Sequence, residues 1–397
     1  MTETNSDRRV WVLFSTADWH TPYWTNKQHM ARQLALYSGP VLYIESIGLR
    51  GLKLSSRMDL GRIWARLRKA TCPLTEPEPG ITVFSPLVLP MGHSRRWVRR
   101  LNAWLLMRGI RRFLCKHAHG QKPSLWTYHP FIQDILDALQ HETCVYHCVD
   151  DLAAIPGMAT GFKKAEAWLL ERANVVFTTS AALTERCAAV SSNVHFLSNV
   201  ADVAHFQTAH EEAEPAVFAS IPRPRIGYVG VLSDFKVNFP LIEEIASARP
   251  EWQWVLIGTE REGQADPVLA RLRALPNVHC LGYCEYARLP CILGALDCAT
   301  LPTLLNDYTR SMFPMKYFEY LAAGLPVVST PLDFTRTHSA GLFVAKDVAA
   351  FEAALAAALS KGRYTKADAC ALVGDNSWDA RTQKMLEVVE GSSNVST

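Results

Sequence analysis

The chain has 397 residues, of which 49% are hydrophobic and 20% charged. This length suits two domains better than one, and the composition supports a packed core and excludes a largely disordered chain. No apolar run reaches the ~18 residues that a membrane-spanning helix needs, and no signal peptide precedes Val10. We therefore expect a cytoplasmic protein that does not cross a bilayer.

The net charge of +3 is unevenly distributed along the chain. Residues 50–119 contain fifteen Lys and Arg residues against three acidic residues, which is a local balance of +12. Such a one-sided basic region indicates contact with a polyanion or with an anionic membrane surface.

The cysteines indicate neither disulfides nor a metal site. The chain has ten cysteines, none in a C-x-x-C pair, and most lie in apolar runs. A zinc site formed by Cys280, Cys284, Cys291 and Cys298 is the specific alternative, but these gaps do not match zinc ribbons or fingers. We predict free and mostly buried thiols in a reducing compartment.

Short apolar runs alternate with segments of helical periodicity through the first half of the chain. The expected strands are 10–15, 41–44, 81–84, 125–128, 145–148, 175–178 and 195–197. The expected helices are 26–37, 95–116, 132–139, 163–172 and one from residue 181. This alternation is typical of a parallel, doubly wound sheet covered by helices on both faces.

The pattern breaks in the acidic, proline-rich segment 207–224, which we interpret as a linker. Beyond it, strands are expected at 225–229, 254–257, 278–281, 298–301 and 327–330, and helices at 241–248, 267–274, 287–296, 314–323, 348–360 and 378–390. We therefore predict an α/β protein with domains at 1–206 and 225–375. The C-terminal segment 376–397 is expected to cross back to the first domain.

Residues 308–330 form the most informative segment. Pro314 suits the first turn of a helix, Gly324 its end, and Pro326 prevents its continuation. The N–H groups at the start of such a helix can bind an anion, to which Ser311 could donate a hydroxyl and Lys316 a charge. Glu319 could accept hydrogen bonds from the vicinal diol of a ribose. The alternative is an ordinary helix with a surface Lys316–Glu319 pair.

The stretch P-x-K-x-x-E-Y-L-A-A-G-x-P-V-V, from Pro314 to Val328, resembles the donor-binding signature of GT-B-fold glycosyltransferases of family 4. The strand 225–230 with the following Lys236, and the segments 254–258 and 277–282, are similar to the rest of that donor domain. Segments 145–151, 176–180 and 197–200 resemble the acceptor half. The resemblance covers most of the chain and implies two Rossmann-like domains facing a cleft.

The resemblance implies a retaining transfer from a nucleotide sugar, with no cofactor and no required metal. It assigns donor contacts to Gly230, Lys236, Thr309, Ser311, Met312, Lys316 and Glu319, and a base pocket to Gly258 and Gly282. Lys236 would neutralise the departing diphosphate, whose charge grows as the glycosidic bond breaks. No D-x-D triplet is present to hold a metal.

The sequence departs from the family pattern at three places. Ser311 stands where the family has the first glutamate of a pair, and this departure leaves the identity of the donor sugar open. Val231 replaces an arginine that many relatives carry after the strand glycine, so Lys236 has more of the phosphate charge to neutralise. The bulky turn 16–27 lacks a glycine pair, so acceptor entry should differ.

Three polar residues follow strands at the predicted carboxyl edge of the first sheet, where ligands bind in open α/β sheets. His129 could contact the reacting sugar, or it could cap a loop carbonyl. Asp150 and Asp151 could bind acceptor hydroxyls or serve as a base, or they could be a helix N-cap and a solvated neighbour. We include all three with Lys236 as candidate catalytic residues.

The helical stretch 94–112 mixes arginines with tryptophans, which is the composition of an interfacial membrane helix. We expect Arg95, Arg96, Trp97, Arg99, Arg100 and Trp104 to form a membrane or acceptor patch, and Trp64 with its basic neighbours to form a second. The alternative is a helix whose Trp97, Leu101, Trp104 and Leu105 face the core. Nucleic acid is not expected as a partner because no binding motif accompanies the charge.

The sequence thus favours a glycosyltransferase that builds an envelope or exported polysaccharide on a glycan or lipid-linked acceptor, at the inner face of the cell membrane. Two alternatives stay open: a GT-B-type nucleotide-sugar epimerase, and a binding subunit whose catalysis has decayed. A nicotinamide or flavin enzyme is not expected, since neither domain opens with G-x-G-x-x-G.

Overall fold

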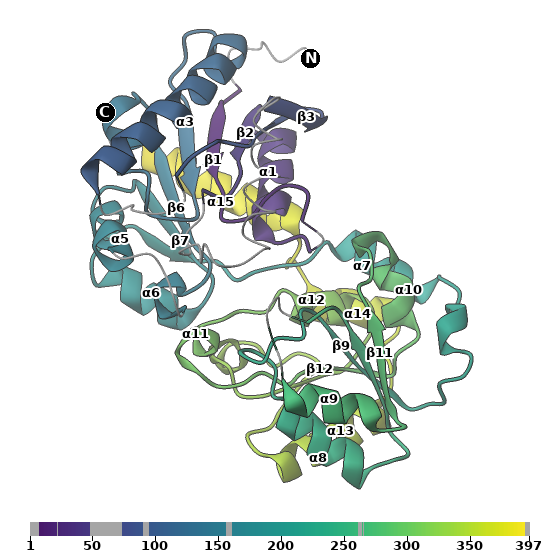
Figure 1. The fold of residues 1–397 in the computed structure, drawn as a ribbon. Helices are drawn as coiled ribbons and strands as arrows, with labels where there is room; N and C mark the ends of the chain where they lie inside the picture. Colours follow the sequence, from purple (N-terminus) through teal and green to yellow (C-terminus); the bar gives the residue numbers. More distant parts are fainter. Residues whose placement is uncertain are drawn as a thin grey trace. The chain divides into compact units, whose positions relative to one another are not determined.

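The computed structural model describes residues 8–21, 23–47, 74–89, 95–155, 161–260, 264 and 266–393. The chain divides into two compact units, which Figure 1 colours along the sequence. Unit 1 comprises Met1–Leu197 and Arg381–Thr397, and unit 2 comprises Ser198–Ala380.

Unit 1 is built on an eight-stranded sheet in the order β3-β4-β2-β1-β5-β6-β7-β8. The strands are β1 (Trp11–Phe14), β2 (Val41–Ile44), β3 (Leu74–Glu78), β4 (Ile81–Phe84), β5 (Ser124–Thr127), β6 (Cys144–Cys148), β7 (Val175–Thr178) and β8 (Val194–Phe196). Only β3 is antiparallel to its neighbour. The short central strands are buried on both faces, as their continuous apolar runs predict.

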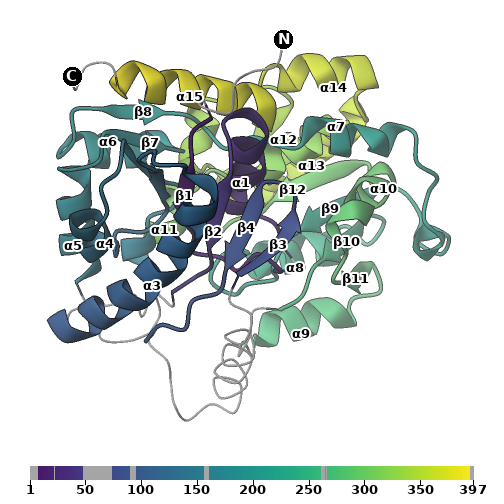
Figure 2. The same cartoon turned by 90° about the horizontal axis from the view of Figure 1, so that it is seen from above.

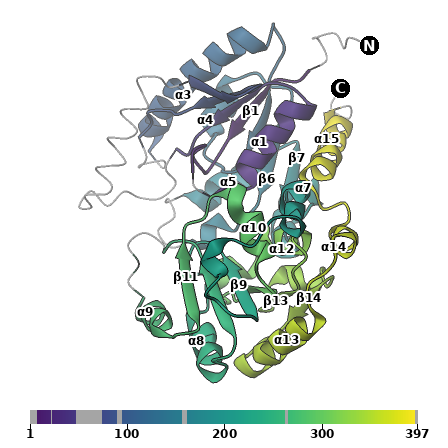
Figure 3. The same cartoon turned by 90° about the vertical axis from the view of Figure 1, so that its right-hand side faces the viewer.

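Helices cover both faces of this sheet, as Figure 3 shows. The helical elements are α1 (Asn26–Tyr37), α3 (Arg96–His117), α4 (Gln133–Ala138), η1 (Leu152–Ala154), α5 (Phe162–Leu170), α6 (Ala181–Ala188) and α15 (Trp378–Ser393). One core packs α3, α4, α5 and α6 against the sheet through side chains such as Leu106, Ile135 and Leu169. Helices α1 and α15 lie on the opposite face (Figure 3).

Unit 2 has a six-stranded parallel sheet in the order β11-β10-β9-β12-β13-β14. The strands are β9 (Arg225–Val229), β10 (Gln253–Ile257), β11 (Val278–Gly282), β12 (Cys298–Leu301), β13 (Val327–Ser329) and β14 (Leu342–Val344). Counted within the unit, this is the order 3-2-1-4-5-6 of dinucleotide-binding folds, whose ligands bind where the strand order reverses. In unit 2 that point lies between β9 and β12.

Two cores sandwich the second sheet, and Figure 2 gives another view of the helices that supply them. The helical elements are α7 (Val203–Gln207), η2 (Thr208–His210), η3 (Ala216–Phe218), α8 (Phe239–Ala248), α9 (Pro267–Ala274), η4 (Tyr286–Arg288), α10 (Leu289–Gly294), α11 (Asp307–Arg310), α12 (Lys316–Ala322), η5 (Asp333–Arg336), α13 (Val348–Lys361) and α14 (Lys366–Val373). Helices α7, α10, α12 and α14 contribute to one core, and α8, α9 and α13 to the other. Both units are therefore doubly wound, as predicted.

The segment 207–224 differs from the predicted linker. It belongs to unit 2, and the division between the units falls at Leu197 instead. The reason is burial, because Phe218 and Ile221 are 0% and 5% exposed and belong to the same core as α12. The acidic residues and prolines of this segment flank Phe218 and Ile221 in the sequence. At the other end, α15 passes from unit 2 into unit 1, where Ser392 accepts a hydrogen bond from Asn193 at 3.2 Å.

Candidate functional site

Two loops of unit 2 meet where its strand order reverses. Strands β9 and β12 are parallel neighbours, so the loops that follow them leave the same edge of the sheet. The Leu304 N–H donates to the Lys236 carbonyl at 2.8 Å, and the Asn306 side-chain amide donates to the Phe235 carbonyl at 2.8 Å. These bonds fix the backbone around Lys236.

Tyr308 forms an aromatic support for the Lys236 side chain. The Lys236 ammonium lies 3.4 Å from the Tyr308 hydroxyl and 4.9 Å from the centre of its ring. Tyr308 itself is only 6% exposed, whereas Lys236 is partly exposed. A cation held over a ring in this way keeps its charge in a defined place while leaving N–H donors for an anion.

Glycines end three neighbouring strands of the sheet at positions where a side chain would not fit or would be strained. Gly230, Gly258 and Gly282 have φ angles of +155°, +144° and +72°. The Gly230 N–H donates to the Ile257 carbonyl at 2.9 Å, and the Gly258 N–H donates to the Gly282 carbonyl at 2.7 Å. The three chain turns are thus joined edge to edge, which leaves an open backbone surface suited to a nucleotide.

Helix α12 begins later than the sequence predicts. We expected it to start at Pro314, but it spans Lys316–Ala322. The Tyr317 N–H bonds the Pro314 carbonyl at 3.2 Å, a three-residue spacing, so the chain enters the helix through one tight turn. The turn is anchored from outside, because the Asn199 amide donates to the Phe313 carbonyl at 2.8 Å.

The Lys316–Glu319 pair is not a surface pair. The Glu319 residue is only 5% exposed, and its carboxylate lies 3.3 Å from the Lys316 ammonium. A Cβ placed on Gly230 would stand 3.5 Å from the Lys316 Cε atom, so this lysine runs alongside the end of β9. The pair therefore brings one cation and one carboxylate to the edge of the sheet where Gly230 lies.

Tyr320 fixes α12 against that strand. Its side chain is fully buried, and its hydroxyl accepts a hydrogen bond from the Val229 N–H at 2.9 Å. Sequence reasoning gave no role to Tyr320 or to Tyr308, although both lie in the informative segment. Their positions next to Glu319 and Thr309 in the sequence were the available indication of a role. A buried tyrosine there needs a hydrogen-bond partner for its hydroxyl.

Three predicted donor contacts are used inside the protein. Thr309 is fully buried, and its hydroxyl donates to the Leu304 carbonyl and accepts from the Asn306 N–H at 3.0 Å, so its side chain caps the start of α11. The Ser311 hydroxyl donates to the Tyr308 carbonyl at 3.3 Å, and the Met312 N–H donates to the Thr309 carbonyl at 3.0 Å. Lys236, Lys316 and Glu319 are the predicted charged groups at this edge.

Known proteins resemble this chain in both sequence and fold. Residues 223–361 match the family model described as glycosyl transferases group 1. Over 231 residues, the chain is 26% identical to TuaH of Bacillus subtilis (strain 168), which is named as a teichuronic acid biosynthesis glycosyltransferase. That stretch covers 55% of this chain and 58% of TuaH, so the match spans less than two thirds of that relative.

Solved structures show the same architecture over nearly the whole chain. Sucrose-phosphate synthase of Thermosynechococcus elongatus matches with a TM-score of 0.72 at 14% identity, covering 97% of this chain and 99% of its own. HepE of Anabaena, solved in complex with UDP and glucose, matches with a TM-score of 0.64 at 14% identity, covering 96% and 99%. The fold is GT-B. The match to the group 1 family model covers residues 223–361, which lie within unit 2.

The matched region 223–361 includes both strand glycines that we assigned to the base pocket and all the donor residues proposed from the sequence. The two departures at Val231 and Ser311 lie in it as well. Neither residue supplies a charge. The structure places the Lys316 side chain alongside Gly230 and the Lys236 ammonium against Tyr308. Among the described residues, no group of His, Cys, Asp or Glu is arranged to hold a metal ion.

In unit 1, the structure places His129 and Asp150 after neighbouring parallel strands, β5 and β6. His129 is 1% exposed, and its Nδ1 atom accepts a hydrogen bond from the Phe131 N–H at 3.2 Å. The ring proton of the neutral imidazole therefore sits on Nε2. Asp151 is partly exposed and precedes η1, as a cap would, but its side chain makes no capping hydrogen bond.

An ion pair between Arg186 and the buried Glu166 lies near the end of β6. The Arg186 guanidinium bonds the Glu166 carboxylate and lies 3.3 Å from the Cys148 sulfur at the end of β6. Burial opposes the charge of Arg186, but its hydrogen bond to Glu166 and the charges of Cys148, Glu166 and Asp151 raise its pKa above the ordinary value.

The bulky turn after β1 is held by buried polar side chains. Glu45 is 3% exposed and accepts hydrogen bonds from the Trp19 N–H at 2.9 Å and the Ser85 hydroxyl at 2.6 Å. The Gln28 side chain donates to the Asp18 carbonyl at 3.0 Å from the first turn of α1. These bonds hold the turn in the absence of the glycine pair that the family pattern led us to look for.

The α3 patch is exposed rather than turned towards the core. Trp97 and Trp104 are 59% and 56% exposed, and Arg95, Arg96 and Arg100 are exposed beside them, while Arg99 is half-buried. The alternative of a core-facing tryptophan stripe is therefore wrong. The second predicted patch, around Trp64, lies outside the described residues. Within the described ranges, no helix combines the length and the apolar character needed to cross a membrane.

The nine described cysteines are all free, but only Cys144, Cys148, Cys187 and Cys298 are buried, so the prediction of mostly buried thiols is wrong for this part of the chain. Cys298 is buried in β12, and burial raises its pKa above the ordinary value. Cys72 lies outside the described residues.

Proposed function

We propose that the protein is a glycosyltransferase that moves a sugar from a nucleotide sugar to an acceptor in the synthesis of an envelope or exported glycan. The observation that carries this proposal is the ion pair between the partly exposed Lys316 and the buried Glu319 beside Gly230, inside the region that matches the group 1 family. The relative TuaH, named for teichuronic acid biosynthesis, supports the assignment to glycan synthesis.

The donor would bind along the edge of the unit 2 sheet. A diphosphate lying beside Gly230 would meet the ammonium of Lys236 from the β9 loop and that of Lys316 from α12. Glu319 would accept hydrogen bonds from the ribose hydroxyls, and the base would lie over the Gly258 and Gly282 turns. The name of the HepE structure, a complex with UDP and glucose, supports a nucleotide sugar of this kind.

The chemistry follows from where charge develops. As the bond between the sugar and the diphosphate breaks, the leaving oxygens gain negative charge, and two fixed cations lower the energy of that state. We propose that these lysines do this without a metal, and that the anomeric configuration of the sugar is retained. Held over Tyr308, the Lys236 ammonium needs little reorganisation during the reaction.

The acceptor would bind at the carboxyl edge of the unit 1 sheet. Because the His129 Nδ1 atom is occupied by the Phe131 N–H, its Nε2–H would donate a hydrogen bond to the transferred sugar rather than remove a proton. Asp150 and Asp151 would orient acceptor hydroxyls. We propose a glycan or lipid-linked acceptor, and therefore a protein that works in the cytoplasm and binds to the membrane surface through α3.

A donor screen tests this function. Full-length protein is incubated with uridine, guanosine and thymidine sugar nucleotides, and release of nucleoside diphosphate is measured with and without acceptor glycans. Release with at least one donor is expected for the wild type and for Lys346→Ala, an exposed lysine of the same domain. Release is expected to be lost in Lys236→Ala.

Two results of that screen would contradict the proposal. An epimerised sugar nucleotide formed from the donor alone would identify an epimerase instead. No release with any donor, together with unchanged cellular glycan in Lys236→Ala and Glu319→Ala strains, would identify a non-catalytic subunit.

A further inference from the structure

One face of α3 presents large apolar side chains to the solvent. Trp97, Leu101 and Trp104 are 59%, 38% and 56% exposed. At about 100° per residue, these three side chains lie within about 60° of one another around the helix axis. The helix buries the opposite side, where Leu106 and Ile110 enter the core. An exposed apolar stripe of this kind marks a contact surface.

The charge of α3 is almost uncompensated. The helix contains six arginines and one lysine, and no acidic residue. Among the described residues, Arg99 pairs with Asp134 at 3.1 Å and Lys116 lies 3.8 Å from Glu76, but the other five arginines of α3 form no ion pair. A stripe of tryptophan and leucine surrounded by free guanidinium groups complements a bilayer surface, with its apolar interior and its layer of phosphates.

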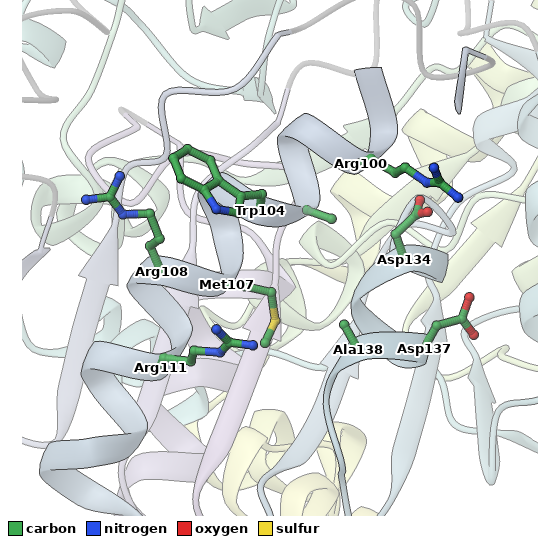
Figure 4. A pocket seen from close by; sticks show the side chains of 9 residues that line it. Arg100, Trp104, Met107, Arg108, Arg111, Asp134, Asp137 and Ala138 are labelled. Atoms are coloured by element: carbon green, nitrogen blue, oxygen red, sulfur yellow. The ribbon is translucent and has the colours of Figure 1, made fainter. Parts of the chain in front are cut away.

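A groove beside the stripe is lined by acidic as well as basic side chains. It has a volume of about 320 Å³ and lies between α3 and α4. Figure 4 shows the arginines and Trp104 on α3 and the two aspartates on α4. The lining residues are Arg100, Ala103, Trp104, Met107, Arg108, Arg111, Asp134, Asp137 and Ala138. The groove thus has a cationic wall, an anionic wall and apolar side chains between them.

The free charges of the groove are of both signs. Asp134 is used by Arg99, and Arg108 lies over the Trp104 ring at 5.0 Å. Arg100, Arg111 and Asp137 form no ion pair with described residues, although all three line the same groove. A ligand that satisfies them needs an anionic group for the guanidinium groups and a cationic group for the carboxylate.

We propose that this groove binds the headgroup of a phospholipid that carries both a phosphate and a primary ammonium, as phosphatidylethanolamine does. Arg111 binds the phosphate, Asp137 binds the ammonium, and Trp97, Leu101 and Trp104 enter the boundary between headgroups and acyl chains. The inference rests on the membrane association proposed above and adds the class of lipid that is recognised.

The Asp137 carboxylate is the feature that separates this ligand from a purely anionic lipid. A headgroup with a phosphate and no cation, such as phosphatidylglycerol, satisfies the arginines but brings negative charge towards Asp137. A headgroup with a quaternary ammonium, such as phosphatidylcholine, has no N–H groups for the carboxylate to accept. Discrimination among the three headgroups therefore reports on the groove itself, and not on charge attraction alone.

Vesicle flotation with the full-length protein tests the proposal. The vesicles are phosphatidylcholine alone, phosphatidylcholine with phosphatidylethanolamine, and phosphatidylcholine with phosphatidylglycerol, all at ~150 mM salt, where long-range attraction is screened. We expect the ethanolamine vesicles to bind about tenfold more protein than phosphatidylcholine alone. Equal flotation with these two vesicles overturns the proposal.

Matched variants then test the two walls of the groove. Arg111→Gln is expected to lower binding to ethanolamine vesicles about tenfold, whereas Lys164→Gln, an equal charge loss at an exposed site on α5, leaves it unchanged. Asp137→Asn is expected to weaken binding to ethanolamine vesicles and to strengthen binding to glycerol vesicles, while Glu185→Gln on α6 changes neither. A gain with both lipids in Asp137→Asn would mean that only net charge matters, and would overturn the headgroup assignment.

The stripe and the enzyme activity are tested separately. Trp97→Ala with Trp104→Ala is expected to abolish flotation, and unchanged flotation would overturn insertion of the stripe. Donor hydrolysis in solution is expected to be the same in all these variants, because none of them alters the matched region 223–361. If the wild type hydrolysed no donor, the proposed function would be refuted, but the lipid measurement would stay valid.

Discussion

Gly258 and Gly230 approach so closely that a Cβ atom on Gly258 would stand 1.8 Å from the Gly230 carbonyl oxygen. No side chain fits in that space, since real Cβ atoms do not approach a backbone oxygen within 3.0 Å. The two strand ends can lie in contact only because residue 258 is a glycine. This contact places Gly230, and with it the neighbouring Lys316, at the edge of the sheet.

Gly258→Ala should therefore separate the two turns and destabilise unit 2. Overpacking and the positive φ of +144° together cost about 2–4 kcal/mol, and nucleotide binding should be lost with the displaced turn. Gly282→Ala is the matched control, because its φ is +72° but no atom lies within 4 Å of the added carbon. Thermal unfolding of both variants measures the difference. A similar fall in the melting temperature for both would mean that the contact has no special importance.

Lys236→Gln should remove most of the stabilisation that a nucleoside diphosphate gives. A ligand that binds only the folded protein at about 100 times its Kd stabilises it by about 2.7 kcal/mol, which should appear as a rise in the melting temperature. The variant without ligand should melt close to the wild type, because Lys236 is partly exposed and its cation lies over the Tyr308 ring rather than in the core. Lys346→Gln should keep the full ligand-induced rise. Equal rises in Lys236→Gln and the wild type would exclude Lys236 from the binding site.

Glu319→Gln should reduce discrimination between ribose and deoxyribose. Losing one hydrogen bond to a charged carboxylate costs about 1.5–3 kcal/mol of binding free energy. The wild type should therefore bind a nucleoside diphosphate about tenfold or more tightly than its 2′-deoxy analogue, and the variant should bind the two with nearly equal affinity. Calorimetric titration with both ligands measures the ratio. A ratio that stays the same in the variant would leave Glu319 only its ion pair with Lys316.

The sequence predicted the elements that depend on local pattern. Strand β9 and helix α9 have the predicted bounds, because an apolar run and a proline-initiated amphipathic turn specify them directly. Lys316 and Glu319 were also identified, since their spacing on one helix places them together wherever the helix lies. The antiparallel edge strand β3 was not predicted, because its exposed, charged residues carry no apolar period.

Properties that depend on packing could not be predicted in this way. The Thr309 hydroxyl donates to the Leu304 carbonyl, a partner that only the folded loop brings near. The composition of segment 207–224 is that of a linker, but Phe218 and Ile221 bury it on unit 2. The direction of Trp97 was left open, because periodicity shows which residues share a face but not which face the rest of the protein covers.

His147 predicts how the stability of unit 1 depends on pH. It lies in the middle of β6, 2% exposed, between the rings of Trp126 and Tyr128. Within the described residues, neither ring nitrogen has a hydrogen-bond partner. Burial, with smaller contributions from the charges of Lys27 on α1 and Arg381 on α15, lowers the pKa of His147 to about 3.

The sign of the effect follows from the two pKa values. Between about pH 3 and the ordinary value of 6.5, the unfolded chain binds a proton at this histidine and the folded chain does not. Stability is therefore fully present above pH 6.5 and falls as the pH drops, by up to about 1.4 kcal/mol per pH unit from this group. His147→Phe should keep the aromatic packing and remove this slope. The comparison is urea unfolding of both proteins at pH 7.5 and pH 5, where the wild type should lose about 2 kcal/mol more than the variant. Parallel losses in the two proteins would show that His147 is protonated in the folded state and that the acid sensitivity comes from other groups.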